Sequence, residues 1–196
     1  MEKVNIENQK ITALEPCYGP NGGNASKIYY KDGEVILDNR RTRSLLKYIA
    51  KKFSVDLEAL RKNYGNYLAC SQYVPLCINR FIILIPVKMR SPLGFYDGAI
   101  GYVNLDSIVD LKDAPGTPGK KEPQCFIHLE GGQVVPSLFS SGNLKQQITR
   151  AKIARDYFCY LQDADCKKKA WQEELEERFR KFWEIFGPPF GPETKD

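Results

Sequence analysis

The sequence has one histidine, His128, among its 196 residues, and none of its six cysteines stands in a C-x-x-C pair. It therefore lacks the ligand spacing of a zinc site and the framework of a disulfide-rich domain, and we expect reduced thiols. The longest apolar run, Phe81 to Ile85, is too short to cross a bilayer. The first residues, MEKVNIENQK, carry charge and no apolar stretch. We thus expect no secretory signal, no membrane association and a soluble, cytoplasmic protein.

Signatures of the common enzyme classes are also missing. GPNGGNAS is rich in glycine, but no GK[ST] follows it, so it does not match a phosphate-binding loop. His128 stands between Ile127 and Leu129 without a partner carboxylate or a nucleophile motif, which is typical of a structural histidine. We predict that the protein is not an enzyme and that it needs no metal ion or cofactor.

The charges of the chain are unevenly distributed. A net charge of +5 is mild, and 42% hydrophobic residues are enough for one substantial core with an appendage. Between Asp38 and Lys62, however, eight Arg and Lys residues stand against three acids, whereas acids gather near the end in WQEELEERFRKFWEIF. The basic stretch is therefore a candidate surface for an acidic partner.

The first third of the chain predicts strands followed by two short helices. ITALEPCYG and KIYYKDGEVIL suggest early strands, the second folded into a hairpin at Asp32-Gly33. From residue 42 to residue 53, apolar residues recur at helical spacing, and Ser54 is placed to cap a second helix that should end near Gly65. Such a helical pair occurs in DNA-binding modules, and equally in ordinary folds with solvated lysines.

The middle of the chain is rich in β-branched and aromatic residues. VPLCINRFIILIPVKMRSPLGFYDGAIGYVNLDSIVDL predicts buried strands, in which Pro86 marks a strand end, an edge or a bulge because it lacks a backbone donor. CFIHLEGGQVVPSLF predicts two further strands that turn at Gly131-Gly132. The predicted fold class is α+β: a mainly antiparallel sheet with packed helices and an appended C-terminal helix.

SSGNLKQQITRAKIARDYFCYLQ predicts an amphipathic helix that is capped by Ser141 or Asn143. Its apolar face is formed by Leu144, Ile148, Ala151, Ala154, Phe158 and Leu161. Lys145 and Lys152 share a neighbouring face. Arg155 projects within the apolar stripe, where it should snorkel, pair with a buried acid or face a partner, and we favour a structural role for it.

The last part of the chain predicts another helix, with large apolar residues in steps of three and four: Trp171, Leu175, Phe179, Phe182 and Phe186. This stripe either covers the sheet of its own domain or joins two subunits. We therefore expect an α+β domain over residues 1–162, an amphipathic aromatic helix over residues 163–187 and a disordered tail over residues 188–196.

A series of short motifs follows the basic pair Arg61-Lys62. The motifs are ILIPV, GYVNLDSI, IHLEGGQVV, Ser140-Ser141, and a helix with Gln147, Arg150, Ala151, Arg155 and Phe158 in register. In this order they resemble the competence transcription factor (ComK) family of Gram-positive bacteria. That family has a strand ending in F-P-T, a Trp-Ile strand, a turn with N-G and a helix of the form Q-x-x-R-a-x-x-x-R-x-x-F. The chain departs from the pattern at Val87, which replaces the Thr, and at Tyr102, which replaces the Trp.

The resemblance implies a transcriptional activator that binds A/T-rich promoter DNA, largely through the minor groove, and that self-associates as a homo-oligomer on paired boxes. A narrow A/T minor groove concentrates negative potential and attracts Arg and Lys. The candidate DNA-binding residues are Arg40, Arg41, Arg43, Lys47, Arg61, Lys62, Lys88 and Arg90, with Lys145 and Lys152 as phosphate contacts. A solvated surface charge is the alternative for each of them. The alternative function is a protein-interaction or regulatory module whose partner binds the C-terminal aromatic helix.

Overall fold

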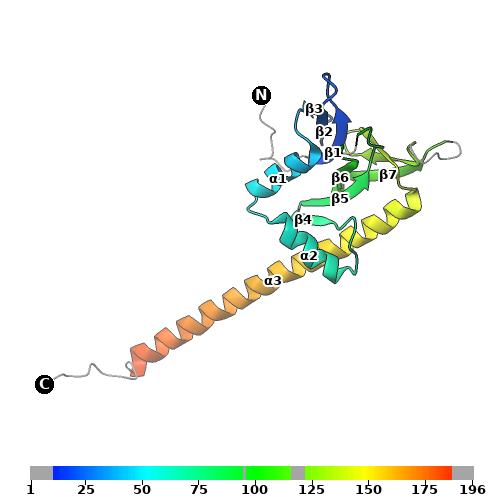
Figure 1. Cartoon of the computed structure of the whole chain (residues 1–196). Coiled ribbons are helices and arrows are strands. Elements are labelled where there is room, and N and C mark those ends of the chain that lie inside the picture. Colours follow the sequence, from blue (N-terminus) through cyan, green and yellow to red (C-terminus); the bar gives the residue numbers. More distant parts are fainter. Residues whose placement is uncertain (1–10, 95, 116–121, 187–196) are drawn as a thin grey trace. The chain divides into compact units, whose positions relative to one another are not determined.

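The computed structural model describes residues 11–94, 96–115 and 122–186, and within residues 163–186 it describes the side chains of Glu177 and Arg180 only. The strands of these residues form two antiparallel sheets (Figure 1). The larger sheet has six strands in the order β3-β2-β1-β6-β5-β4, and the smaller has three in the order β7-β8-β9. Three α-helices accompany the sheets in the described part of the chain, so the fold is α+β, as the sequence predicts.

The strands coincide with the apolar segments of the sequence. The larger sheet contains β1 (Ile11–Tyr18), β2 (Asn24–Tyr30), β3 (Val35–Asp38), β4 (Leu76–Asn79), β5 (Ile82–Lys88) and β6 (Ile100–Asn104). A 3-10 turn, η1 (Leu105–Ser107), leads to the smaller sheet, which contains β7 (Ile108–Asp113), β8 (Cys125–Leu129) and β9 (Val134–Ser137).

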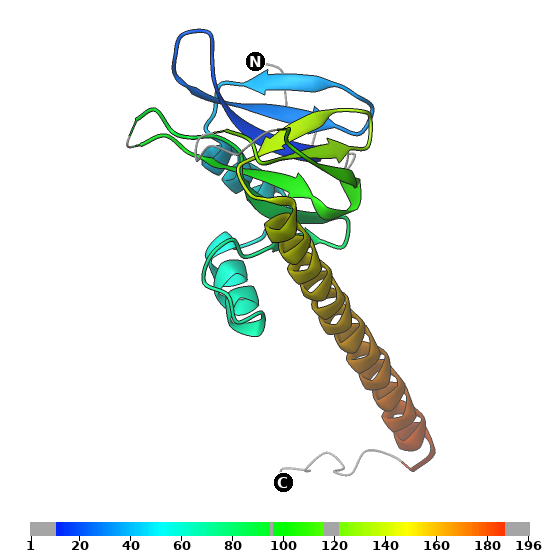
Figure 2. The ribbon, with the colours of Figure 1, turned by 90° about the vertical axis from the view of Figure 1, so that its right-hand side faces the viewer.

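Both predicted hairpin turns are confirmed, and the two hairpins contact each other. Gly33 and Gly131 have φ angles of 94° and 90°, in the left-handed region that glycine adopts without strain. The side-chain amide of Gln133 donates to the carbonyl oxygen of Tyr30 over 2.7 Å. The β8–β9 hairpin is thereby tied to the β2–β3 hairpin, and Figure 2 shows the smaller sheet beside the larger one.

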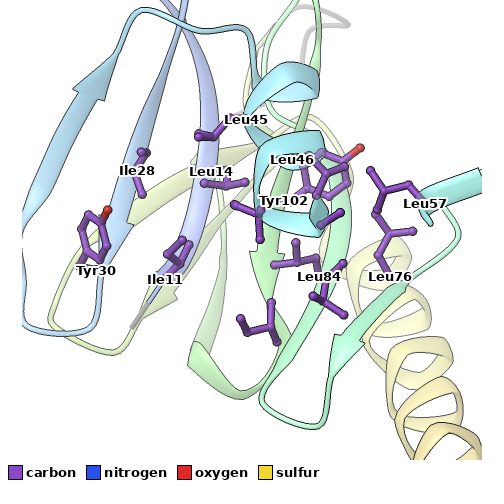
Figure 3. Close-up of a cluster of buried hydrophobic side chains, with 14 residues drawn as sticks. Ile11, Leu14, Ile28, Tyr30, Leu45, Leu46, Leu57, Leu76, Leu84 and Tyr102 are labelled. Atoms are coloured by element: carbon purple, nitrogen blue, oxygen red, sulfur yellow. The ribbon is translucent and has the colours of Figure 1, made fainter. Parts of the chain in front are cut away.

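The main core lies between α1 (Thr42–Lys52) and one face of the larger sheet (Figure 3). The predicted apolar stripe of α1 is buried, with Leu45, Leu46 and Ile49 at 1% exposure or less. These side chains belong to the same buried cluster as Leu14 and Leu84 of the sheet. Burying one such side chain contributes about 1.5–3 kcal/mol, so the stripe holds α1 against the sheet.

β1 joins the two halves of the larger sheet, because it pairs with β2 on one edge and with β6 on the other. The pairing of β1 with β6, which we call the seam, spans two residue pairs, one of which is Leu14 with Tyr102. A Cβ on Gly101 would lie 2.5 Å from the Leu14 carbonyl oxygen and 2.2 Å from the Met89 sulfur. The seam therefore needs a residue without a side chain at position 101.

The junction between the first two helices differs from the sequence prediction. Ser54, predicted as the N-cap of the second helix, has a φ of 55° and ends α1, so that prediction is wrong. Asp56 caps α2 (Leu57–Tyr67) instead, since its carboxylate accepts from the amides of Glu58 at 2.8 Å and Ala59 at 3.2 Å. A carboxylate also stabilises the positive end of the helix, which a serine hydroxyl does less well.

α2 ends at Tyr67, close to Gly65, where the sequence predicts its end. A Cβ on Gly65 would lie 2.9 Å from the carbonyl oxygen of Cys70, so the glycine allows the loop after α2 to fold back closely on the helix.

Pro86 has the predicted edge position. β4 pairs with β5 only as far as Leu84, so at Pro86 the strand β5 has β6 as its single neighbour.

α3 (Ser141–Phe186) is one helix of 46 residues, and it runs through the boundary predicted between residues 162 and 163. The chain divides into one compact unit up to Asp156 and a second from Tyr157 onward. The side chains of the predicted aromatic stripe are not among those that the structure describes, and the predicted tail, residues 188–196, also lies outside the described residues. None of the described helices contains a segment both long and apolar enough to span a bilayer.

The part of α3 in the first unit packs through a narrower face than the sequence predicts. Three of the predicted positions are buried, at 2% exposure or less: Leu144, Ala151 and Ala154. Ile148 is only partly buried. The Oγ of Ser140 accepts from the amide of Asn143 at 3.4 Å, so Ser140 is the capping residue in place of the predicted Ser141 or Asn143.

Replacing the glycine at the seam tests how much stability depends on this pairing. We expect Gly101→Ala to lower the free energy of unfolding by about 1–3 kcal/mol, because the new methyl group must displace backbone and the Met89 side chain. Gly98→Ala is the matched control, since a Cβ at Gly98 meets no atom within 4 Å and should change stability by less than about 0.5 kcal/mol. Urea unfolding measures both, and equal stability of the two variants would contradict a tight seam.

Candidate nucleic-acid interface

Four of the ten predicted DNA-binding residues line one cleft of about 620 Å³: Arg41, Arg43, Arg61 and Arg90. They come from distant places in the chain, namely the start of α1, the middle of α2 and the segment after β5. The seam brings them together, because it joins the half of the sheet that leads into α1 to the half that contains β5 and β6. We call this hollow the arginine cleft.

The other lining residues of the arginine cleft that the structure describes are polar, apolar or aromatic, and none of these is acidic. They include Ile100 and Tyr102 from β6, and Tyr96, which is 80% exposed. Arginine keeps its charge at neutral pH, and its planar fork of donors suits phosphate oxygens and stacking on flat rings. Four such groups without a carboxylate among them create a positive hollow that attracts polyanions.

A buried hydroxyl pair fixes the chain between Arg41 and Arg43. The Oγ of Ser26 lies 2.9 Å from the Oγ1 of Thr42 and donates to the Arg40 carbonyl oxygen over 2.8 Å. Because Thr42 is turned into the protein, the arginines on either side of it are exposed. The unpaired amides in the first turn of α1 add partial positive charge at the same place.

Lys47 lies in a second hollow, of about 590 Å³, between α1 and α2. Three further basic residues line it: Arg43, Lys51 and Arg61. Asp56 and Glu58 line it as well, so its charge is mixed. Arg43 and Arg61 belong to both this hollow and the arginine cleft, which makes the positive surface continuous along the two helices.

Lys62 lies in a third and larger groove, of about 940 Å³. Arg61 and Tyr102 line this groove as well as the arginine cleft. Val74 and Pro86 are also among its lining residues. The groove therefore lies where β4 stops short of Pro86 and leaves that part of β5 uncovered.

Arg40 is engaged within its own loop and does not line the cleft. Its guanidinium donates to both carboxylate oxygens of Asp38, over 2.8 and 2.6 Å, and lies over the ring of Tyr48, 4.6 Å from the ring centroid. The hydrogen bond from Arg40 holds the pKa of Asp38 below its usual value. Arg40 and Arg41 are neighbours in sequence, but of the two only Arg41 lines the cleft.

Arg90 lines the cleft with its guanidinium held in place. The group lies 4.1 Å from the centroid of the Tyr18 ring, its Nε donates to the Gly98 carbonyl oxygen over 2.7 Å, and its Nη2 donates to the side chain of Asn24. Arg90 thus contributes a charge whose position is fixed before any ligand arrives.

Besides Arg40, three more predicted contacts lie outside the arginine cleft and the two adjoining grooves. Lys88 is half-buried at the end of β5, where it pairs with Ile100. Lys145 and Lys152 are exposed on α3, as predicted, but neither lines any of the three hollows. The structure thus gathers Arg41, Arg43, Lys47, Arg61, Lys62 and Arg90, and leaves Arg40, Lys88, Lys145 and Lys152 apart.

Tyr96 and Lys51 are lining residues that were not among the predicted contacts. Lys51 belongs to the basic stretch after Asp38, so its charge was a usable signal. Nothing in the sequence marks Tyr96 as a lining residue. It lies in the loop after β5, and that loop lines the cleft because of the pairing of β6 with β1.

Arg155 pairs with an acid, which is one of the roles considered for it, but the acid is not buried. Its Nη1 lies 2.9 Å from an Asp106 carboxylate oxygen, and the two side chains are 33% and 51% exposed. We expect Arg155→Ala to lower the free energy of unfolding by only about 0.2–1 kcal/mol, as is usual for an exposed ion pair. A double-mutant cycle with Asp106→Ala, in which urea unfolding gives the stability of each variant, measures the interaction energy of the pair. A loss of several kcal/mol would show that Arg155 holds the core together.

Comparison with known proteins finds no relative of this chain. No family model, no curated protein and no solved structure matches it.

Proposed function

We propose that the protein is a DNA-binding transcriptional regulator that holds duplex DNA against the arginine cleft. One observation carries the proposal: four arginines from separate segments line one hollow, and no carboxylate is among its described lining residues. The repulsion between like charges grouped in this way opposes folding, and the binding of a polyanion relieves it. Phosphate contacts from Arg and Lys supply most of the affinity of DNA-binding proteins and make it dependent on salt.

A preference for A/T-rich DNA is part of the same proposal. A/T tracts have a narrow minor groove with enhanced negative potential, and arginine is the side chain that enters it most readily. Arg41 is exposed immediately before a short helix, which suits it for this role, whereas we assign Arg43 and Arg61 to phosphates. The resemblance to the competence transcription factors supports binding through the minor groove. It also supports the proposal that the protein activates transcription in the cytoplasm and binds paired boxes as a homo-oligomer.

The alternative function, a module that binds a protein partner through the C-terminal aromatic helix, stays a prediction. The side chains on which it depends lie outside the described residues. Salt separates the two functions, since apolar association responds weakly to salt and phosphate binding responds strongly.

Neutralising the two arginines that belong to more than one hollow tests DNA binding. We expect Arg43→Ala with Arg61→Ala to weaken binding to A/T-rich and G/C-rich duplexes and to reduce the slope of log Kd against log salt by about two, one for each lost phosphate contact. Fluorescence polarisation at several salt concentrations measures both quantities.

Arg80→Ala is the matched control, because Arg80 is exposed in the β4–β5 turn, stacks on Phe81 and lines none of the three hollows. It should bind as the unaltered protein does. Thermal unfolding should show that the double variant is folded, since Arg43 and Arg61 are exposed. An unchanged slope in the folded double variant would place the binding surface elsewhere.

A further inference from the structure

The loop between β5 and β6 exposes two large apolar side chains, Leu93 and Tyr96, the second of which lines the arginine cleft. Leu93 is 85% exposed and Tyr96 is 80% exposed, the highest values for large hydrophobic residues in the described part of the chain. Tyr96 lines the arginine cleft beside Arg41 and Arg43. An exposed leucine and tyrosine on a loop that lines a cationic hollow through the tyrosine indicate a partner that combines anionic groups with apolar surfaces.

A network of hydrogen bonds around Asp97 holds this loop. The Asp97 carboxylate accepts from the Tyr18 hydroxyl at 2.6 Å, from the side-chain amide of Asn24 at 2.8 Å and from the backbone amide of Gly94 at 2.8 Å. These donors, the Tyr18 hydroxyl first, hold the pKa of Asp97 well below its usual value, so the carboxylate stays charged. The backbone amide of Asp97 donates back to the Gly94 carbonyl oxygen over 3.1 Å.

The same network connects the loop to Arg90 and to the first strands. The backbone amide of Leu93 donates to the Tyr18 hydroxyl oxygen over 3.0 Å, while Arg90 covers the ring of Tyr18 and donates to Asn24 and Gly98. Hydrogen bonds therefore hold the backbone at Leu93, Gly94 and Asp97, next to the two exposed side chains. A preformed loop loses little conformational entropy when its side chains enter a partner.

We propose that Leu93 and Tyr96 form a wedge that enters a base step of the duplex bound at the arginine cleft and kinks it; this inference rests on the proposed DNA binding. Phosphates on either side of the step would contact Arg43 and Arg61, and the apolar faces of the separated bases would contact the two wedge side chains. Apolar wedges of this kind partly unstack a step and bend DNA by about 20–90° toward the major groove.

The position of the charges favours DNA over the other partners that an exposed apolar loop could meet. A membrane surface is broad and requires cations on an open face around the apolar tip, whereas Arg41, Arg43, Arg61 and Arg90 line a hollow. A duplex can present phosphates into a hollow and base faces to its edge at the same time. A purely apolar protein surface would leave the four arginines without anionic partners.

The test uses the full chain and a duplex with an A/T-rich centre, in which 2-aminopurine replaces one adenine and a dye marks each end. The unaltered protein should raise the 2-aminopurine fluorescence through unstacking and shorten the distance between the dyes. Leu93→Ser with Tyr96→Ser should abolish both changes, weaken binding about tenfold through the loss of base stacking, and leave the salt slope unchanged. Val109→Ser, which alters an apolar side chain that is 67% exposed on β7, should behave as the unaltered protein does.

A second variant tests the fixed loop while keeping both wedge side chains. Tyr18→Phe removes the hydroxyl that donates to Asp97 and accepts from Leu93, so amide exchange at Leu93 and Gly94 should accelerate and the 2-aminopurine signal should fall.

The outcomes separate this inference from the proposed function. If the unaltered protein binds no duplex, the proposed function fails. If it binds with a steep salt slope but neither unstacks nor bends the duplex, or if the double serine variant bends it equally well, the wedge is overturned and DNA binding stands. Binding to phosphatidylglycerol vesicles that requires Leu93 and Tyr96, without bending of DNA, would overturn the wedge in favour of a membrane surface.

Discussion

The seam between β1 and β6 is the contact on which the rest of the structure depends. It is short, but it joins the half of the sheet with β2 and β3 to the half with β4 and β5. Gly101 permits the approach, and buried Asn104 reinforces it by donating to the Ile11 carbonyl oxygen at the start of β1 over 3.4 Å. Without this pairing, the arginines of α1 and the loop after β5 would belong to separate pieces of structure.

The same constraint explains why neighbouring basic residues have different roles. Asp38 engages Arg40 two residues away, so that charge is compensated locally. Thr42 is buried on Ser26 of β2, and this contact leaves Arg41 and Arg43 exposed beside the cleft. The distinction follows from which residue of the loop is drawn inward, and it depends on the pairing of strands as much as on the charge of the residues.

Local features of the fold were predictable from the sequence because local physics determines them. The apolar period of α1 and the glycine turns of the hairpins are examples, since each requires only residues close together in the chain. Ser54 shows the limit of that reasoning. Ser54 and Asp56 are both good N-caps, and the choice between them depends on whether the chain first closes α1 with a left-handed residue.

The candidate site was predictable in part for the same reason. The basic stretch after Asp38 pointed to Arg41, Arg43 and Arg61, but the place of Arg90 beside them depends on a strand pairing between residues about ninety positions apart. The exposed tyrosine of the following loop could not be assigned to the site without that pairing. Charge marks a residue as a candidate, whereas long-range topology decides which candidates meet.

Four like charges in one hollow oppose the folding that brings them together, so the rest of the domain must offset their repulsion. The buried stripe of α1 and the tight seam supply that stability, and the network around Asp97 fixes Arg90 within the hollow. Asp97 carries the opposite charge, but its carboxylate is occupied by Tyr18, Asn24 and Gly94, and it compensates Arg90 from outside the lining of the cleft. The domain thus holds its arginines in position, and among the residues that the structure describes no carboxylate pairs with Arg41, Arg43 or Arg61. A site arranged in this way gains more from an anionic ligand than a surface whose charges are already paired.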